Sequence, residues 1–195
     1  MNPPLDIFTT DCIVINSPAR NRDEAFAVAG DLFQSRLGVS SSSIVRCLNI
    51  RENLSSTALV SEVAIPHGIV AGIQIPVGCL IKLVSAIDFT APDRHKISTL
   101  IFLLFPEITT HEHLQGLSSL AEQLLDVSLR RALLSEKSPE RISQLLNHAM
   151  NFRETLPTLE SHSVFNQSIA SRNQDIQNYL EEWAALECRP TQSMH

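Results

Sequence analysis

Apolar positions repeat every three or four residues between residues 21 and 37, which predicts a helix. Asn21 can cap its first turn and Gly38 marks its end, because asparagine favours N-caps and glycine favours the left-handed position after a helix. A second helix is predicted over residues 41–49, with its cap among the preceding serines. The first half of the chain therefore begins with two consecutive helices.

Short apolar stretches rich in β-branched residues follow, and they predict strands. Residues 57–65 form the first stretch, and Pro-His-Gly at 66–68 is expected to be the turn that ends it. Residues 77–83 and 99–105 are typical of buried strands. On a turn, the imidazole of His67 would be exposed and half protonated near neutral pH, which suits covalent catalysis or phosphate capture. The alternative is a histidine that merely ends a strand.

Helical spacing returns at residues 111–125, where a threonine at 109 or 110 can cap the first turn. Asp126 begins a shorter helix over 127–134, and another begins at Ser138 with Pro139 in its first position. Strands alternating with helices predict an α/β domain over residues 1–150.

Residues 151–174 are polar and contain Pro157 and several serines, which predicts a linker. Residues 175–186 are again helical in pattern, and residues 151–195 are therefore expected to be a linker plus a C-terminal helical appendage. Tyr179 and Trp183 lie on its apolar face. Either they pack onto the domain or they dock a partner.

Composition narrows the function classes. The chain has 195 residues, 44% of them hydrophobic and 18% charged, with a net charge of -6, so it lacks the basic character of a nucleic-acid binder. No secretory signal is apparent, and the longest apolar stretch is too short to span a bilayer, which favours a cytoplasmic protein without membrane insertion. The cysteines are scattered and are expected to be reduced thiols. They are Cys12, Cys47, Cys79 and Cys188.

Three ordered segments carry a resemblance. They are residues 51–68, which include Arg51-Glu52 and Ala-Ile-Pro-His-Gly; residues 87–93, Ile-Asp-Phe-Thr-Ala-Pro-Asp; and residues 101–121, which include His113. Their order and spacing resemble the fructose- and mannitol-type (type 2) enzyme IIA family of the bacterial phosphotransferase system, and the nitrogen-regulatory branch is the most similar. The resemblance covers roughly residues 5–150 and implies a central mixed β-sheet flanked by helices.

The resemblance also implies roles for individual residues. His67 matches the histidine that accepts a phosphoryl group from the phosphocarrier protein HPr as tele-phosphohistidine. His113 matches a second active-site histidine, Arg51 an arginine of the same pocket, and Asp93 the aspartate of a turn. These residue types suit the chemistry, because phosphoryl transfer between imidazoles needs an unprotonated ring nitrogen and neutralisation of the phosphoryl oxygens. No metal or other cofactor is implied.

Each of these residues also has a purely structural interpretation. His113 can be a solvated residue in the first turn of a helix, although the free N–H groups there also favour an anion. Arg51 can be a charge at a helix C-terminus, and Asp93 can be a turn former. The His-Glu-His sequence at 111–113 does not have the spacing of the His-Glu-x-x-His zinc motif, so no metal site is expected.

The sequence therefore predicts a phosphotransferase with a mainly regulatory role. It would accept phosphate from an HPr-type phosphocarrier on His67 and signal through phosphorylation-dependent binding to a regulated target protein. The alternative is a non-catalytic protein-binding module with an enzyme IIA fold that has lost efficient phosphotransfer. Two departures from the family pattern favour the alternative: Val60 stands where glycine is usual, and Glu62 is expected to add negative charge near a phosphorylated His67.

Overall fold

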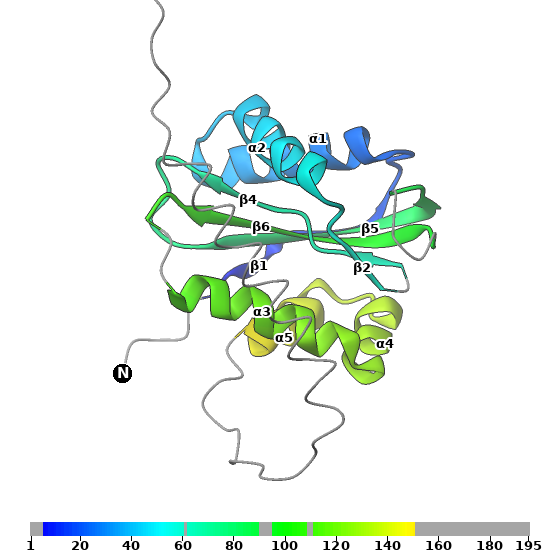
Figure 1. The fold of residues 1–195 in the computed structure, drawn as a ribbon. Coiled ribbons are helices and arrows are strands. Elements are labelled where there is room, and N and C mark those ends of the chain that lie inside the picture. Colours follow the sequence, from blue (N-terminus) through cyan, green and yellow to red (C-terminus); the bar gives the residue numbers. More distant parts are fainter. Residues whose placement is uncertain (1–5, 61, 90–94, 109–110, 151–195) are drawn as a thin grey trace, which may run out of the picture. The chain divides into compact units, whose positions relative to one another are not determined.

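Residues 6–60, 62–89, 95–108 and 111–150 are described by a computed structural model of the chain. Their strands form a central mixed sheet that is covered by helices on both faces (Figure 1), so the predicted α/β fold is confirmed. Asp93 and the predicted linker and appendage over 151–195 lie outside the described residues.

The sheet is built from strands that are not consecutive in the chain. These are β1 (Phe8–Ser17), β2 (Ala58–Val60), β3 (Val63–Ala64), β4 (His67–Val70), β5 (Val77–Ile87) and β6 (Ile97–Pro106). Their order is β1-β5-β6-β3-β2, with β4 also paired to β6. Neighbours β5 and β6, and β2 and β3, are antiparallel, whereas the other pairs are parallel.

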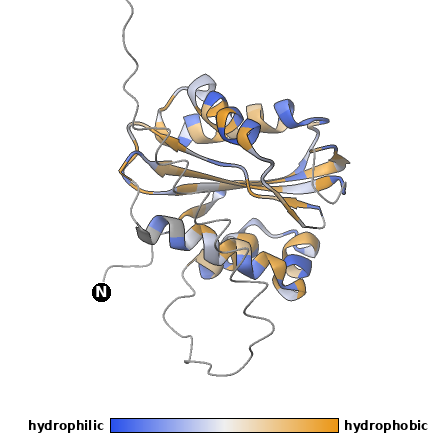
Figure 2. Cartoon of the chain, viewed as in Figure 1, coloured by the Kyte–Doolittle hydropathy of each residue, from blue (hydrophilic) through white to orange (hydrophobic). Residues whose placement is uncertain are grey.

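The helices divide between the two faces of the sheet. One face is covered by α1 (Arg22–Leu37) and α2 (Ser41–Leu54), and the other by α3 (His111–Leu125), α4 (Val127–Ser135) and α5 (Pro139–Met150). Each face has its own cluster of buried apolar side chains, centred on Phe26 and Phe102 on the first face and on Leu103 and Phe105 on the second. Figure 2 shows the hydrophobic residues concentrated in the sheet and on the helices around it. The two cores fix both helical layers against the sheet.

The predicted ends of α1 are confirmed, and the predicted end of α2 is wrong. The Asn21 side chain accepts from Glu24 N at 2.8 Å, and Gly38 follows with a φ of 70°. Helix α2 continues to Leu54, five residues beyond the predicted residue 49, because no glycine or proline stops it there. The longer helix carries Arg51 in its last turn.

The segment before His67 also differs from its prediction. Instead of one strand over residues 57–65, the chain forms β2 and β3 as a small antiparallel pair, with Glu62 in the turn at a φ of 73°. The ladder then continues across Pro66, whose carbonyl accepts from Leu103 N at 3.0 Å. His67 is consequently the first residue of a strand, β4, and does not lie in a terminal turn.

Candidate functional site

His67 lies at the start of β4 and pairs with Leu103 of β6. Its side chain is only 9% exposed, so the expectation of an exposed histidine is wrong. The physical reason is in part a tertiary contact: after Pro66 the chain returns to the sheet, and the last turn of α2 brings Arg51 against the ring.

The hydrogen bonds of the ring define its tautomer. His67 Nδ1 lies 2.8 Å from the carbonyl oxygen of Ile65, and a carbonyl can only accept, so Nδ1 carries the proton. The other nitrogen, Nε2, accepts from Arg51 Nε at 3.0 Å. The lone pair of the neutral imidazole therefore lies on Nε2, facing the arginine.

The protonation state follows from the same surroundings. Burial lowers the pKa of His67, the Arg51 guanidinium lowers it further, and the Ile65 carbonyl opposes both, so that the pKa falls from 6.5 to about 3. The ring is thus neutral at neutral pH, and the expected half protonation is wrong. A neutral imidazole with an unprotonated ring nitrogen is the nucleophilic form, and in His67 this nitrogen accepts from Arg51.

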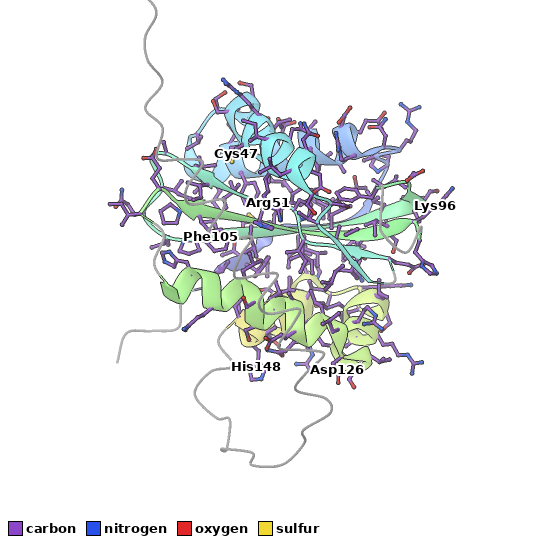
Figure 3. The ribbon with its side chains drawn as sticks, viewed as in Figure 1. Cys47, Arg51, Lys96, Phe105, Asp126 and His148 are labelled. Atoms are coloured by element: carbon purple, nitrogen blue, oxygen red, sulfur yellow. The ribbon has the colours of Figure 1, made fainter. Side chains whose placement is uncertain are left out.

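Arg51 serves the helix and the histidine together. Its Nη1 donates to the carbonyl of Ser55 at 2.9 Å, just past the end of α2, while its Nε donates to His67. The side chain is 7% exposed and lies between α2 and the sheet (Figure 3). Both sequence interpretations of Arg51 are therefore correct in geometry: it is a charge at a helix C-terminus and a neighbour of the candidate nucleophile.

Next to Arg51 is a buried carboxylate that the sequence interpretation missed. Glu52 is 6% exposed, and its two oxygens accept from the backbone N–H and the hydroxyl of Thr57 at 2.9 and 2.5 Å. The signal in the sequence was an acidic residue directly after Arg51, in the last turn of a helix, where the macrodipole disfavours negative charge.

His113 lies in the first turn of α3 and is half-buried. Its ring centroid is 6.3 Å from that of Phe105, with 36° between the two planes. Phe105 pairs with Ile69, two residues beyond His67 on β4, and alternate residues of a strand share a face. His67 therefore points to the same face of the sheet as Phe105, beside which His113 packs, and Arg51 is hydrogen-bonded to His67.

The other residues singled out from the sequence contribute less. Glu62 is exposed and accepts from Ser98 Oγ at 3.4 Å, at the opposite end of β6 from Leu103, the partner of His67. At the rise of a strand this separation is about 16 Å, so the expected negative charge beside His67 is not found there. The side chain of Val60 lies outside the described part of the chain. Among the described residues, no group of three or more His, Cys, Asp or Glu side chains is arranged to hold a metal ion.

Comparison with known proteins adds the family. Residues 6–149 match the family model described as "Phosphoenolpyruvate-dependent sugar phosphotransferase system, EIIA 2". The chain belongs to this family. Within it, the relatives place the chain in the nitrogen-regulatory branch: it is 30% identical to a nitrogen regulatory protein of Pseudomonas aeruginosa over 74% of this chain and 95% of that protein. A nitrogen regulatory protein of Klebsiella oxytoca is 28% identical over 74% and 90%.

Solved structures of enzyme IIA proteins agree with the fold. The nitrogen regulatory protein IIA-Ntr of Neisseria meningitidis superposes with a TM-score of 0.69 at 35% identity, over 72% of this chain and 97% of that one. The mannitol enzyme IIA of Escherichia coli superposes with a TM-score of 0.57 at 23% identity, over 71% and 97%. The chain is therefore a phosphocarrier or regulatory component of the phosphotransferase system. None of the helices in its described part has the length and apolar character to cross a bilayer.

Proposed function

We propose that the protein accepts a phosphoryl group on His67 Nε2 from the phosphohistidine of an HPr-type carrier, and that its phosphorylation state controls binding to a target protein. The observation that supports this most is the tautomer of the His67 ring. Nδ1 donates a hydrogen bond to the Ile65 carbonyl, and the lone pair of the ring lies on Nε2. The lowered pKa supplies this form at any pH well above about 3.

In the proposed step, the lone pair of Nε2 attacks phosphorus in line with the donor nitrogen. The P–N bond to the donor breaks, a P–N bond to Nε2 forms, and the donor ring leaves with the electron pair as a neutral imidazole. The Nδ1 proton of His67 stays on the ring, so no proton transfer is required. The phosphorylated ring then carries a positive charge, and the Ile65 carbonyl 2.8 Å from Nδ1 stabilises it.

Arg51 and His113 would act on the phosphoryl oxygens. Arg51 Nε donates to the lone pair that must attack, so this hydrogen bond has to break before transfer. The freed guanidinium can then donate to the phosphoryl oxygens, and its charge offsets theirs. His113, in the first turn of α3, would add a further donor, and the N-terminal dipole of α3 would favour the same anion.

A complex formed by a protein of the same fold supports the proposal that the partners of this chain are proteins. The structure of a mannitol enzyme IIA from Escherichia coli has been solved in complex with phosphorylated enzyme IIB, at 21% identity and a TM-score of 0.58 to this chain. For the nitrogen-regulatory branch we propose a phosphocarrier as the donor and a regulatory protein as the target. A cytoplasmic location follows from a phosphocarrier donor, and we place the whole activity within residues 1–150.

The test is phosphorylation of the full chain with HPr, the kinase of HPr and phosphoenolpyruvate, followed by intact mass measurement. We expect one added phosphoryl group, labile in acid and stable in base as phosphoramidates are, and its complete loss in His67→Ala. His95→Ala, which changes an exposed histidine before β6, is the control and should be labelled fully. No labelling of the parent protein would instead favour the non-catalytic binding module, and labelling of His67→Ala would show that another residue accepts the phosphate.

A further inference from the structure

Glu52 is a buried carboxylate for which the proposed transfer step has no direct use. It lies in the last turn of α2, where the helix dipole disfavours a negative charge, and burial adds a desolvation cost. Its position next to Arg51 in sequence brings it to the same end of the helix. A buried polar side chain in this position needs hydrogen-bond partners to offset the cost of its burial.

Those partners are both on Thr57. Glu52 Oε1 accepts from the Thr57 backbone N–H at 2.9 Å, and Oε2 accepts from the Thr57 hydroxyl at 2.5 Å. Both side-chain oxygens of Glu52 are therefore hydrogen-bonded to Thr57. The pair therefore fixes the start of β2 against the end of α2.

Thr57 is connected to His67 by hydrogen bonds through Ile65. The Thr57 carbonyl accepts from Ile65 N at 3.0 Å, and the Ile65 carbonyl lies 2.8 Å from His67 Nδ1. The next residue is Pro66, which has no N–H to donate. Thr57 thus holds the peptide segment whose carbonyl holds the imidazole.

We propose that Glu52, acting through Thr57, is a positioning residue that selects the tautomer of His67, an inference that rests on the proposed function of His67 as phosphoryl acceptor. Free histidine favours the tautomer with its proton on Nε2, which cannot attack phosphorus from that nitrogen. Two neighbours reverse this preference: Arg51 Nε, which can only donate, lies 3.0 Å from Nε2, and the Ile65 carbonyl, which can only accept, lies 2.8 Å from Nδ1. The contribution of the carbonyl is lost when it no longer points at Nδ1. Glu52 and Thr57 keep it there, and the chain thereby presents the Nε2 lone pair.

The two variants of Glu52 separate positioning from charge. Glu52→Ala removes both bonds to Thr57. Glu52→Gln keeps both, because the amide oxygen can accept from the backbone N–H while the amide N–H donates to the hydroxyl. Glu136→Ala is the matched control, since Glu136 accepts from the N–H groups of Lys137 and Ser138 at 2.8 and 2.9 Å in the turn between α4 and α5.

The first readout is the tautomer of His67 in the unphosphorylated protein, measured by ¹⁵N NMR of the imidazole and assigned with His67→Ala. We expect Glu52→Ala to move the proton from Nδ1 toward Nε2, and Glu52→Gln and Glu136→Ala to keep the parent spectrum. The second readout is the single-turnover rate of phosphorylation, which should fall about ten- to a hundredfold in Glu52→Ala, as expected for a misplaced reacting group. Glu52→Gln should restore it.

Parent-like spectra and rates in folded Glu52→Ala would overturn the inference, as would a loss in Glu52→Gln equal to that in Glu52→Ala. If Glu52→Ala does not fold, Thr57→Val replaces it as the test. This variant loses the hydroxyl hydrogen bond and keeps the backbone hydrogen bond, so we expect a smaller shift toward the Nε2 tautomer. The absence of any shift would contradict the inference. The NMR readout needs no phosphate. If the parent protein takes up no phosphate, that result counts against the proposed function. The NMR spectra of the variants still decide whether Glu52 selects the tautomer.

Discussion

At the scale of single residues, the surroundings of His67 keep its imidazole unprotonated at neutral pH. Burial and Arg51 together lower its pKa to about 3, and the Ile65 carbonyl fixes which nitrogen holds the proton. The fold therefore supplies a nucleophile at the cost of a buried group that cannot take up a proton without destabilising the structure.

The first prediction uses this linkage. Between pH 6.5 and about 3 the unfolded chain protonates His67 and the folded chain does not, so stability falls as the pH falls through this window and is independent of His67 above it. From pH 7 to pH 5 the loss is about 2 kcal/mol of unfolding free energy. His67→Gln, which cannot titrate, should lack this part of the pH dependence. Urea unfolding of both proteins at several pH values measures the difference, and parallel curves would contradict it.

The second prediction concerns His113. If it donates to the phosphoryl oxygens, His113→Ala should slow phosphate transfer in both directions by about ten- to a thousandfold, the scale expected for loss of one transition-state donor. His67 should remain the labelled residue. His148→Ala changes an exposed histidine on α5 and serves as the control. Single-turnover kinetics unchanged in His113→Ala would mean that the residue only packs beside Phe105.

At this scale the sequence predicted that Arg51 lies beside His67, but it did not predict the burial or the protonation state of the histidine. The family resemblance implied that Arg51 and His113 lie near His67; the structure shows Arg51 hydrogen-bonded to His67 and His113 packed beside Phe105. The burial of His67 was not foreseen, because it depends on the last turn of α2 reaching the edge of the sheet. No local pattern around His67 encodes that contact.

At the scale of elements, the site depends on how closely α2 packs against β4. Cys47 lies one helical turn before Arg51, and its Sγ donates to the carbonyl of Ile69 at 2.8 Å. A Cβ on Gly68 would lie 2.4 Å from that sulfur, while the next nearest atoms would be at 3.7 Å. The sulfur and the missing side chain together set the spacing between helix and strand (Figure 3 labels Cys47 and Arg51).

The third prediction tests this spacing. Gly68→Ala should destabilise the protein by about 1–3 kcal/mol, as overpacking of a well-packed interior does. In a Cys47→Ala background the added methyl no longer meets the sulfur, so the same substitution should cost less than about 1 kcal/mol. Denaturant unfolding of the four proteins in this double-mutant cycle measures the coupling. Equal costs in both backgrounds would show that α2 adjusts freely.

Elements with strong local signals were predicted well and the others were not. Helix α3 has the predicted bounds, and the Asp126 side chain caps α4 by accepting from Ser128 N at 2.6 Å. Strand β1 was missed, because among the described strands it lies at the edge and pairs with β5 alone, with irregular register and a half-exposed pattern. Strand β4 was missed because Pro66 stands before it, although the ladder crosses the proline through its carbonyl.

At the scale of the whole chain, the last described helix is joined to the first strand. The Asn147 side chain accepts from the N–H of Phe8 at 3.0 Å and donates to its carbonyl at 2.9 Å, as a neighbouring strand would. At the end of α5, Gln123 donates to the carbonyl of Ala149 at 2.8 Å. Helix α5 therefore belongs to the core of the family domain, which the family model matches through residue 149.

The last prediction follows for the domain boundary. A protein ending at Met150 should keep a cooperative unfolding transition and the phosphorylation rate of the full chain, because the bonds of Asn147 and Ala149 and the buried side chains of α5 are all retained. A protein ending at Ser138 loses α5 and leaves its apolar partners on β1 and α3 exposed, so it should aggregate or melt without cooperativity. Calorimetry and the labelling assay compare the three proteins. If the protein ending at Met150 behaves like the one ending at Ser138, residues 151–195 belong to the core, and the boundary near residue 150 is wrong.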